Sequence, residues 1–441
     1  MNMSVAKAWF ARCAPPQRCI STVSVERRNS IRKSTLSLSV IAAIAASTFA
    51  AGALAQTPAG AAKISDGVVK IGLLLDMSSL YADLTGAGSV EAARMAVEDF
   101  GGKVLGAPIE IMFADHQNKA DIAANKAREW IDTQKLDVIA DVAASATALA
   151  VVDVAKQKNK IVMLSGPGAS RLTNEACSPV SVHYAWDTYA LAVGTGRGVL
   201  KGGGDTWFFI TADYAFGHSL EQDTADIVKA GGGKIVGSTR HPLNASDFSS
   251  FILQAQSSKA KVVALANAGG DTVNAIKSAN EFGLTKNQQL AGLLVFINDV
   301  HALGLNVTKG MLLTESFYWD MNDETRKWSR RYFEKMKKMP NMIQAGTYSS
   351  ILHYLKSVKA TGTDDTATVM AKMRSTPIND MFVKNGRIRE DGRMAKEYYL
   401  FEIKQPSESK YPWDYYKLKA TIPADQALLP LAQSRCPLIK K

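Results

Sequence analysis

Cysteine and long apolar runs are scarce in this sequence. The chain carries 4 cysteines among 441 residues, and only Cys177 and Cys436 lie after residue 55. Beyond residue 55, no segment approaches the roughly 18 consecutive apolar residues that a membrane-spanning helix requires. We therefore expect the part of the chain after residue 55 to be soluble and to hold at most one disulfide.

Sequence signatures of catalysis and of metal binding are also missing. The sequence contains no H-E-x-x-H, no G-x-S-x-G, no P-loop and no C-x-x-C, and Gly86-Ala87-Gly88 lacks the third glycine of a dinucleotide-binding fingerprint. The histidines are dispersed without metal-ligand spacing: His116, His183, His218, His241, His301 and His353. We expect no metal, no cofactor and no enzymatic activity.

The first 55 residues have the pattern of a cleaved export signal. Four basic residues lie within 27–33, an apolar and small-residue run covers 36–54, and residues 53–55 form an A-x-A cleavage site. This order is typical of a Sec-type signal peptide. A membrane anchor is the alternative, but the run is rich in Ala and Ser and therefore only weakly hydrophobic. We expect the mature protein to be exported to the periplasm.

The positive charge of the chain belongs largely to this leader. Removing residues 1–55 takes away seven basic residues and one acidic residue, which lowers the formal net charge from +11 to +5. The densest remaining run, Lys335, Lys337 and Lys338, falls in an expected helix and has the character of a solvated face. Because no basic stripe alternates with aromatic residues, nucleic-acid binding is not expected.

The 386 residues that remain are too many for one ordinary core, so we expect two domains. The two remaining thiols favour a single disulfide in an oxidising compartment. A bond between Cys177 and Cys436 would tie the C-terminal tail to the middle of the chain. The sequence alone does not show that the two residues lie within bonding distance.

Strands and helices alternate through most of the chain, which predicts an α/β fold with parallel sheets covered by helices. The expected strands are 68–75, 109–114, 136–140, 161–165, 206–211, 234–238, 261–266, 290–296 and 311–314. From residue 323 the pattern changes to two helices separated at Pro340-Asn341, a third helix over 367–375, and a hairpin around Asp391-Gly392. A final strand is expected at 414–417.

Several of the expected strands end in loops of small and polar residues. These loops are 77–81, 141–147, 165–170 and 267–271. Small residues let a ligand approach the backbone, and N–H groups at a helix N-terminus attract a carboxylate. The alternative is that these residues only cap helices and form turns. Aromatic residues occur at some of the same edges, where they form either a ligand wall or core packing: Tyr81, Tyr214, Phe216, Phe296, Phe317, Tyr318 and Trp319.

Taken together, these segments resemble the type I periplasmic binding proteins, closest to the leucine/isoleucine/valine-binding branch that serves ABC importers. The resemblance covers about residues 63–417. It rests on KIGLLLDMSSLYADLTG from Lys70, the S-x-T loop at 145–147, LSGPGASRLT at 164–173, ADYAFGHSLEQ at 212–222 and TESFYWD at 314–320. No single segment is specific, whereas their order and spacing are.

The resemblance implies two Rossmann-like lobes joined by three hinge crossovers. Carried onto this chain, the crossovers fall near 186–187, 318–319 and 382–385. The expected domains are a signal peptide over 1–55, a first lobe over 66–186 plus 319–384, and a second lobe with the tail over 187–318 plus 385–441.

The resemblance and the loop composition together give a set of expected ligand contacts. They are Ser79, Tyr81, Ser145, Ala146, Thr147, Gly168, Ala169, Ser170, Tyr214, Gly269, Asp271, Phe296 and Asp299. Residues 145–146 and 168–170 would hold a carboxylate, and Tyr81 would shape the selectivity for the side chain of the ligand. Tyr214 would cover the ligand, and Asp271 and Asp299 lie where the family binds an ammonium group. Loops 269–271 and 296–300 depart from the amino-acid-binding pattern, so the carboxylate half of the ligand is the firmer expectation.

These observations favour a monomeric periplasmic receptor that closes on a small carboxylate and delivers it to an ABC permease in the inner membrane. The ligand classes that remain open are a branched-chain or related amino acid and an aromatic acid. A secreted α/β hydrolase or amidase is an alternative, and it requires His183 or His218 beside a serine in the cleft. A ligand-binding subunit of a sensory system is another, and the sequence does not separate it from transport.

Overall fold

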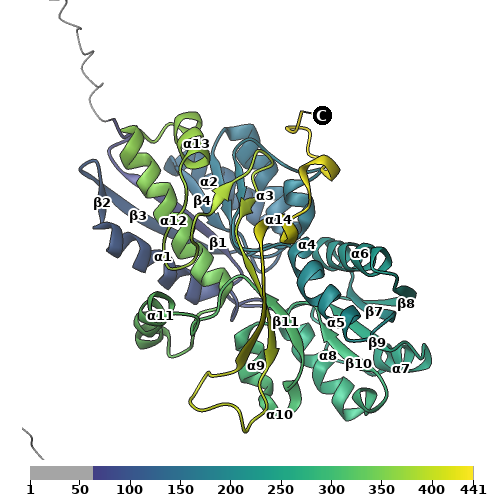
Figure 1. The fold of residues 1–441 in the computed structure, drawn as a ribbon. Helices are drawn as coiled ribbons and strands as arrows, with labels where there is room; N and C mark the ends of the chain where they lie inside the picture. The colour runs from purple at the N-terminus through teal and green to yellow at the C-terminus, as the bar shows by residue number, and fades with distance from the viewer. Residues whose placement is uncertain (1–62, 441) are drawn as a thin grey trace, which may run out of the picture. The chain divides into compact units, whose positions relative to one another are not determined.

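The computed structural model describes residues 63–440, so the expected signal segment lies outside the described residues. Two parallel sheets with helices packed against them account for most of this part of the chain, and a smaller antiparallel sheet crosses beside them (Figure 1). Among the described residues, no helix has both the length and the apolar character needed to cross a bilayer. The α/β class expected from the sequence is confirmed.

The first sheet has six strands in the order β2-β3-β1-β4-β5-β6, all parallel except for the β2–β3 pair. The strands are β1 (Val69–Leu75), β2 (Lys103–Val104), β3 (Ala107–Asp115), β4 (Val138–Asp141), β5 (Ile161–Leu164) and β6 (Ser181–His183). Successive residues of β1 face opposite sides of the sheet, as the pleat requires. Leu73 joins one apolar core and Leu74 joins the other.

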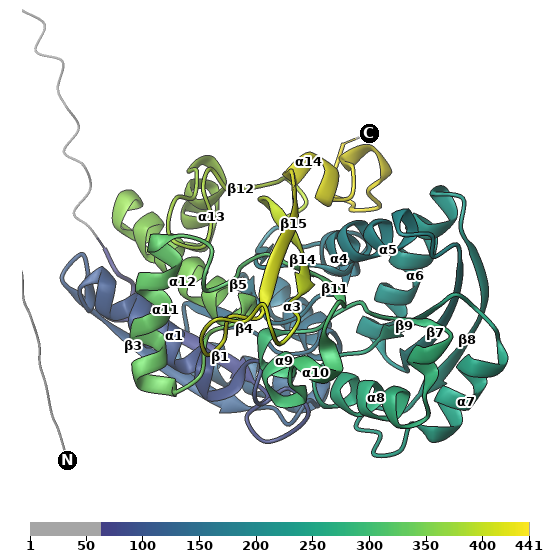
Figure 2. The same ribbon diagram turned by 60° about the horizontal axis from the view of Figure 1, so that its bottom comes forward.

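Helices cover both faces of the first sheet. α1 (Gly86–Phe100) and α12 (Met342–Thr361) pack together on one face, and α2 (Ala120–Gln134) and α3 (Ser145–Lys158) on the other. α12 comes from the second half of the sequence yet lies beside α1 (Figure 2). It begins where Pro340-Asn341 breaks the helical pattern, because the Asn341 side chain accepts hydrogen bonds from the N–H groups of Ile343 and Gln344. α11 (Asp323–Met336) and α13 (Thr366–Ser375) flank this pair.

The second sheet is fully parallel, with the order β10-β9-β7-β8. Its strands are β7 (Thr206–Ala212), β8 (Lys234–His241), β9 (Val262–Ala266) and β10 (Gln289–Gly292). Its main helices are α6 (Ala215–Ala230), α7 (Ser249–Ser257), α8 (Gly270–Glu281), α9 (Ile297–Leu303) and α10 (Leu305–Thr308). The expected strand over 290–296 is too long, because the chain leaves the sheet after Gly292 and α9 begins after Phe296.

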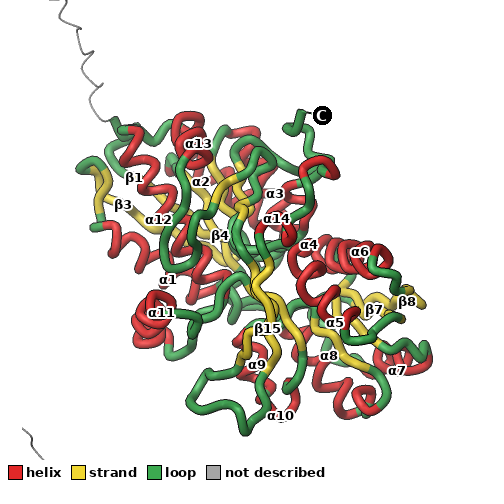
Figure 3. The backbone as a smooth tube through the Cα atoms, viewed as in Figure 1, coloured by secondary structure: helices red, strands yellow, loops and turns green. Residues whose placement is uncertain are grey.

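The third sheet is antiparallel and joins strands that are distant in sequence. It contains β11 (Leu312–Glu315), β14 (Tyr398–Ile403) and β15 (Tyr416–Ile422), in that order (Figure 2). β15 is labelled among the yellow strands of Figure 3. The expectation that the strand at 311–314 belongs to a parallel sheet is therefore wrong: its hydrogen-bond partner comes from the C-terminal hairpin region. A short ribbon, β12 (Arg387–Ile388) with β13 (Met394–Ala395), forms the expected turn at Asp391-Gly392.

Residues 188–201 form a helical segment with a π-helical turn, although the sequence pattern predicts no helix or strand there. It consists of α4 (Thr188–Leu191), the π-helical residues 192–196 and α5 (Arg197–Lys201). The segment begins at Asp187, whose carboxylate accepts a hydrogen bond from the N–H of Ala190. The other oxygen of Asp187 pairs with the buried Arg393 at 2.6 Å. This ion pair ties the chain after β6 to the chain between β12 and β14.

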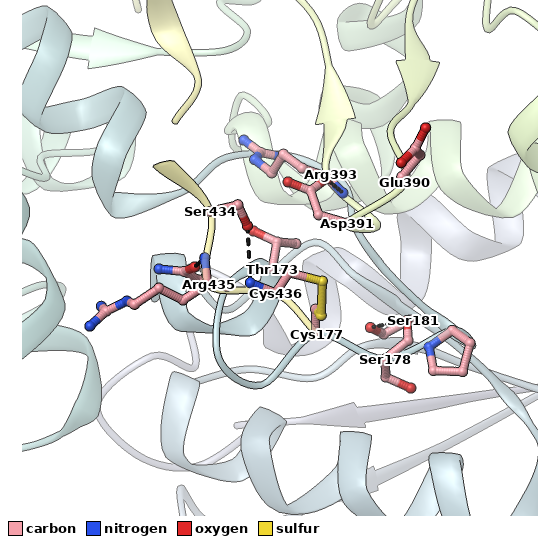
Figure 4. Close-up of a disulfide and its surroundings, with 12 residues drawn as sticks. Thr173, Cys177, Ser178, Ser181, Glu390, Asp391, Arg393, Ser434, Arg435 and Cys436 are labelled. Carbon is pink, nitrogen blue, oxygen red and sulfur yellow. Dashed lines mark hydrogen bonds between the residues drawn. A yellow bond between two sulfur atoms is a disulfide. The ribbon is translucent and has the colours of Figure 1, made fainter. Parts of the chain in front are cut away.

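The two cysteines beyond residue 55 form a disulfide (Figure 4). The Cα atoms of Cys177 and Cys436 lie 5.6 Å apart across a sequence separation of 259 residues. Both side chains are buried, and Ser434 accepts a hydrogen bond from the N–H of Cys436. The bond fixes the tail that follows α14 (Ala424–Ala427) beside the loop between β5 and β6.

Candidate functional site

A small cavity lies where the loops of the first and second sheets meet. The loops after β1, β4, β5, β6, β7, β9 and β10 all contribute to it, together with the start of α12. Its lining residues are Tyr81, Leu84, Thr85, Ala143, Ala144, Ser145, Gly166, Pro167, Gly168, Trp186, Tyr214, Phe216, Ala268, Leu294, Phe296 and Ile343. Ligands of parallel α/β sheets bind at these carboxyl ends of strands.

Five of the expected contacts line this cavity: Tyr81, Ser145, Gly168, Tyr214 and Phe296. Others among the lining residues had a weaker signal in the sequence. Ala143, Ala144, Gly166 and Pro167 belong to the small-residue loops that were expected to approach a ligand, and Phe216 was noted as an aromatic residue at the same edge. The sequence indicates Trp186 only as a hinge crossover position, and nothing near Ile343 in the sequence indicates a ligand contact.

The remaining expected contacts of the first sheet do not line the cavity. The Ser79 hydroxyl donates to the buried Asp76 at 2.7 Å, which shapes the loop after β1. The Thr147 hydroxyl donates to the backbone oxygen of Ala144 at 2.7 Å and thus closes the first turn of α3. Ala146 follows Ser145 in that same turn. The structure gives Ser79 and Thr147 contacts within their own loops.

Ala169 and Ser170 take part in the loop geometry through their backbone. The N–H of Ala169 donates to the Ser145 hydroxyl at 3.0 Å, and the N–H of Ser170 donates to Thr188 at 3.0 Å. Thr188 in turn donates to Asp223 of α6 at 2.6 Å. This chain of hydrogen bonds links the loop after β5 to the helices of the second sheet.

The two carboxylates expected to bind an ammonium group bond to loop amides. Asp271 accepts from the N–H groups of Asn244 and Ala245 at 3.1 and 2.9 Å. Asp299 accepts from the N–H of Phe296 at 2.9 Å and fixes the start of α9. Burial raises the pKa of Asp271 to about 6 and that of Asp299 to about 7. Neither residue lines the cavity.

Gly269 is placed where two loops approach closely. Its φ is +59°, and a Cβ at this position would lie 2.8 Å from the backbone oxygen of Leu80. A larger residue would therefore separate the loop after β9 from the loop after β1. Gly269 itself does not line the cavity, but its small size lets Tyr81 and Ala268 face the same space.

The polar end of the cavity is formed by Ser145 and the N-terminus of α3. The Ser145 oxygen accepts hydrogen bonds from the N–H groups of Gly168 and Ala169 at 3.3 and 3.0 Å. Its own hydroxyl hydrogen has no acceptor within residues 63–440 and is free to donate to a ligand. The first N–H groups of a helix lack partners inside the helix and carry partial positive charge. This end of the cavity is therefore suited to a carboxylate.

Part of the cavity lining is an aromatic wall. The ring of Trp186 meets Phe216 and Phe296 edge to face, with centroid distances of 5.8 and 6.1 Å. The indole N–H of Trp186 donates to the backbone oxygen of Ser165 at 3.1 Å, so the ring presents apolar surface to the cavity. Gly168 lies flat against that ring, since a Cβ there would come within 2.2 Å of it.

Tyr81 and Tyr214 join the loops of the two sheets across the cavity. Their hydroxyl oxygens lie 2.5 Å apart, and both rings line the space. Burial raises the pKa of both phenols well above the usual value, so both remain protonated at neutral pH. One hydroxyl donates to the other, which leaves one hydroxyl hydrogen available to a further acceptor.

No carboxylate, ammonium or guanidinium group lines the cavity within the described part of the chain. Nor does any group of three or more His, Cys, Asp or Glu side chains in residues 63–440 have the geometry to hold a metal ion. The site combines hydrogen-bond donors at Ser145 and the start of α3 with apolar aromatic rings. Its chemistry is therefore suited to binding a small amphipathic anion.

The sequence and the fold were compared with known proteins. Residues 68–410 match the family described as periplasmic binding protein. A periplasmic binding protein from Burkholderia mallei is 59% identical with a TM-score of 0.84, over 85% of this chain and 100% of that one. A branched chain amino acid ABC transporter periplasmic ligand-binding protein from Burkholderia xenovorans is 39% identical with a TM-score of 0.76, over 84% and 99% of the two chains.

A more distant structure shares the fold. It is a solute binding protein of an ABC transporter from Rhodopseudomonas palustris in complex with 3,4-dihydroxybenzoic acid, which is 22% identical with a TM-score of 0.74 over 81% of this chain and 98% of that one. A comparison with curated proteins found no match.

Proposed function

Because the chain belongs to the periplasmic binding protein family, we propose that it captures a small carboxylate in the periplasm for an ABC importer. Its role as a substrate-binding receptor follows from the family and from the similarity to ABC transporter ligand-binding proteins. The observation that supports the ligand class is the cavity itself, whose lining combines donors at Ser145 and the α3 N-terminus with an aromatic wall.

The carboxylate of the ligand binds at the end of the cavity formed by Ser145. A hydroxyl donor and the positive end of a helix together stabilise an anion without a full positive charge. The body of the ligand, a ring or a branched alkyl group, lies against Trp186, Phe216 and Phe296. Contact with such a wall favours apolar groups because it removes their surface from water.

The ligand carries no ammonium group in this proposal. An ammonium placed in a desolvated cavity needs an acceptor of opposite charge, and none of the lining residues supplies one. The carboxylates of Asp271 and Asp299 already accept hydrogen bonds from backbone N–H groups. We therefore favour an aromatic or branched aliphatic acid over a free amino acid.

A thermal-shift screen tests this proposal. Benzoate, 4-hydroxybenzoate and isovalerate are compared with leucine and with methyl benzoate, which keeps the ring of benzoate and removes its charge. A ligand at about 100 times its Kd adds about 2.7 kcal/mol to the free energy of unfolding. At least one of the acids raises the melting temperature, whereas methyl benzoate and leucine do not. If none of the acids does so, or if leucine alone does, the proposed ligand class is wrong.

Capture by closure of two lobes is part of the same proposal. The first lobe comprises residues 66–186 and 319–384, and the second comprises 187–318 and 385–441, with hinge crossovers near 186–187, 318–319 and 382–385. One contact supports closure around a ligand: the Tyr81–Tyr214 bond joins loops on opposite sides of the cavity.

Delivery to an inner-membrane permease, export by the segment before residue 56 and a monomeric state complete the proposal. A matching permease that binds the ligand-loaded protein more tightly than the empty protein supports transport over a sensory role. We propose no catalytic activity. The histidines that a hydrolase would need bond elsewhere: His183 to the backbone oxygen of Pro167 at 2.7 Å, and His218 to Asp213 at 2.8 Å.

A further inference from the structure

The carboxyl group of Asp141 lies directly behind the wall of the cavity. Asp141 ends β4 and is fully buried. The chain that follows it carries Ala143, Ala144 and Ser145 into the cavity lining. Three residues of this connection have left-handed backbone conformations, with φ of +67° at Asp141, +57° at Val142 and +66° at Ala144. Residues other than glycine rarely adopt this conformation, so the surrounding contacts must hold it in place.

Asp141 supplies such contacts to both loops at the polar end of the cavity. Its backbone oxygen accepts the N–H groups of Ser165 and Gly166, each at 3.3 Å. Its side-chain Oδ2 accepts the hydroxyl of Thr347 on α12 at 3.3 Å. The loop after β4 and the loop after β5 thus depend on one residue. The hydrogen bond between Ser145 and Gly168 joins the same two loops.

The other side-chain oxygen, Oδ1, is separated from the cavity by a single glycine. A Cβ at Gly166 would lie 2.3 Å from this oxygen, and Gly166 lines the cavity. Oδ1 is buried and has no hydrogen-bond partner within the described residues. A ligand carboxylate held at Ser145 would therefore lie in a cavity whose lining residue Gly166 has the Asp141 carboxyl beside it.

No charged group neutralises Asp141. The groups that face its carboxyl are the hydroxyl of Ser89 on α1, the hydroxyl of Thr347 on α12 and the N–H of Gly166 after β5, and none of these titrates. Burial without a cation disfavours the ionised form and raises the pKa of Asp141 to about 7. At neutral pH the residue therefore exchanges between its neutral and ionised forms.

We propose that Asp141 is a positioning residue for the ligand carboxylate and that it is neutral whenever the ligand is bound. This inference rests on the proposed function. Two anions separated by one glycine in a dry site repel each other strongly. The ligand arrives as a carboxylate, Asp141 takes one proton from solvent, and the complex holds one negative charge in place of two. Binding of the ligand and binding of the proton are thus linked.

The linkage predicts a pH profile. Above a pKa of about 7 for free Asp141, the apparent Kd rises with pH, by about tenfold between about pH 6 and about pH 8. Ligand binding takes up about one proton at about pH 8 and almost none at about pH 6. Benzoate and isovalerate are suitable probes because both stay ionised over this range.

Isothermal titration calorimetry tests the proposal with benzoate and isovalerate at both pH values, in two buffers of different ionisation enthalpy. Asp141→Asn keeps the shape of Asp141 and the donor and acceptor of its neutral form but does not titrate. This variant shows a flat pH profile and no proton uptake. Asp137→Asn is the matched control, because burial raises the pKa of Asp137 to about 6 and this residue does not line the cavity. The control keeps the pH profile of the wild type.

Thr347→Val gives a second readout that does not depend on the folding of the Asn variant. Removing the hydroxyl that donates to Asp141 raises the pKa of Asp141, so the midpoint of the affinity loss moves to higher pH. A wild-type profile that is flat, or an Asp141→Asn variant that keeps the pH dependence, overturns the inference while ligand binding still supports the proposed function. If neither probe binds any variant, both are wrong.

Discussion

The hydroxyl oxygens of Tyr81 and Tyr214 lie 2.5 Å apart, although the two residues are 133 positions apart in the sequence. Tyr81 is in the loop after β1 of the first sheet, and Tyr214 is in the loop after β7 of the second. Their hydrogen bond is formed where the two sets of loops face each other over the cavity. Under the proposed closure of two lobes on a ligand, this bond reports the closed state.

Replacement of either tyrosine by phenylalanine tests this role. Tyr81→Phe and Tyr214→Phe each remove one side of a hydrogen bond worth about 1 kcal/mol. We expect ligand dissociation measured by stopped flow to become about fivefold faster, with little change in the free energy of unfolding of the empty protein. The double variant should lose no more than either single variant, because both remove the same bond. If both variants lower the free energy of unfolding of the empty protein by the same amount and leave the dissociation rate unchanged, the pair is only a packing contact.

Gly168→Ala tests the close approach of the backbone to Trp186. The added Cβ would lie 2.2 Å from the indole ring, so the ring or the loop after β5 must move. Overpacking of this kind costs about 1–3 kcal/mol, and we expect calorimetry to show a loss of ligand affinity of at least about tenfold from the displaced wall. Gly196→Ala is the control, since its Cβ would meet only ordinary contacts at 3.6 Å or more.

Removal of the disulfide should lower the stability of the protein without changing its affinity for the ligand. We expect Cys177→Ser with Cys436→Ser, or reduction of the wild type, to lower the free energy of unfolding by about 2–4 kcal/mol. The bond closes a chain segment of 259 residues but lies away from the cavity lining. Urea unfolding should therefore shift while ligand affinity stays unchanged. A large loss of affinity in the reduced protein would mean that the tail contributes to the site.

The buried Asp299 makes the stability of the protein fall with rising pH. Burial raises its folded-state pKa to about 7, above the unfolded value of about 3.9. The folded state therefore binds more protons than the unfolded state between these values, and stability is lost as pH rises from about 4 to about 7. In urea unfolding at several pH values, the free energy of unfolding of Asp299→Asn should fall less steeply with rising pH than that of the wild type. An unchanged slope would mean that Asp299 titrates normally.

The sequence predicted most of the α/β fold because its strands are local and strongly apolar. The unit from Val69 to Phe100 is an example: a strand that is apolar except for Lys70 leads through a polar loop into a helix with apolar positions at helical spacing. The third sheet was not predictable in the same way. β11 finds its partner β14 about 85 residues later in the chain, and nothing in the local pattern of either strand identifies that partner.

The same distinction applies to the site. Ser145 and Gly168 were predicted because each belongs to a short run of small and polar residues that directly follows a strand in the sequence. Ile343 enters the cavity only because α12 packs beside α1. The roles of Asp271 and Asp299 stay predictions, and their hydrogen bonds depend on loop amides that no sequence spacing reveals. Local composition therefore identified the loops, whereas tertiary packing determined which side chains line the cavity.

A crystal structure with benzoate or isovalerate bound tests the central claim most directly. The account predicts a carboxylate within about 3 Å of the Ser145 hydroxyl and the first N–H groups of α3. The apolar body of the ligand should lie against Trp186, Phe216 and Phe296. The ligand in another place, or in the reverse orientation with its carboxylate toward the aromatic wall, would contradict the account. So would a bound amino acid whose ammonium group pairs with Asp271 or Asp299.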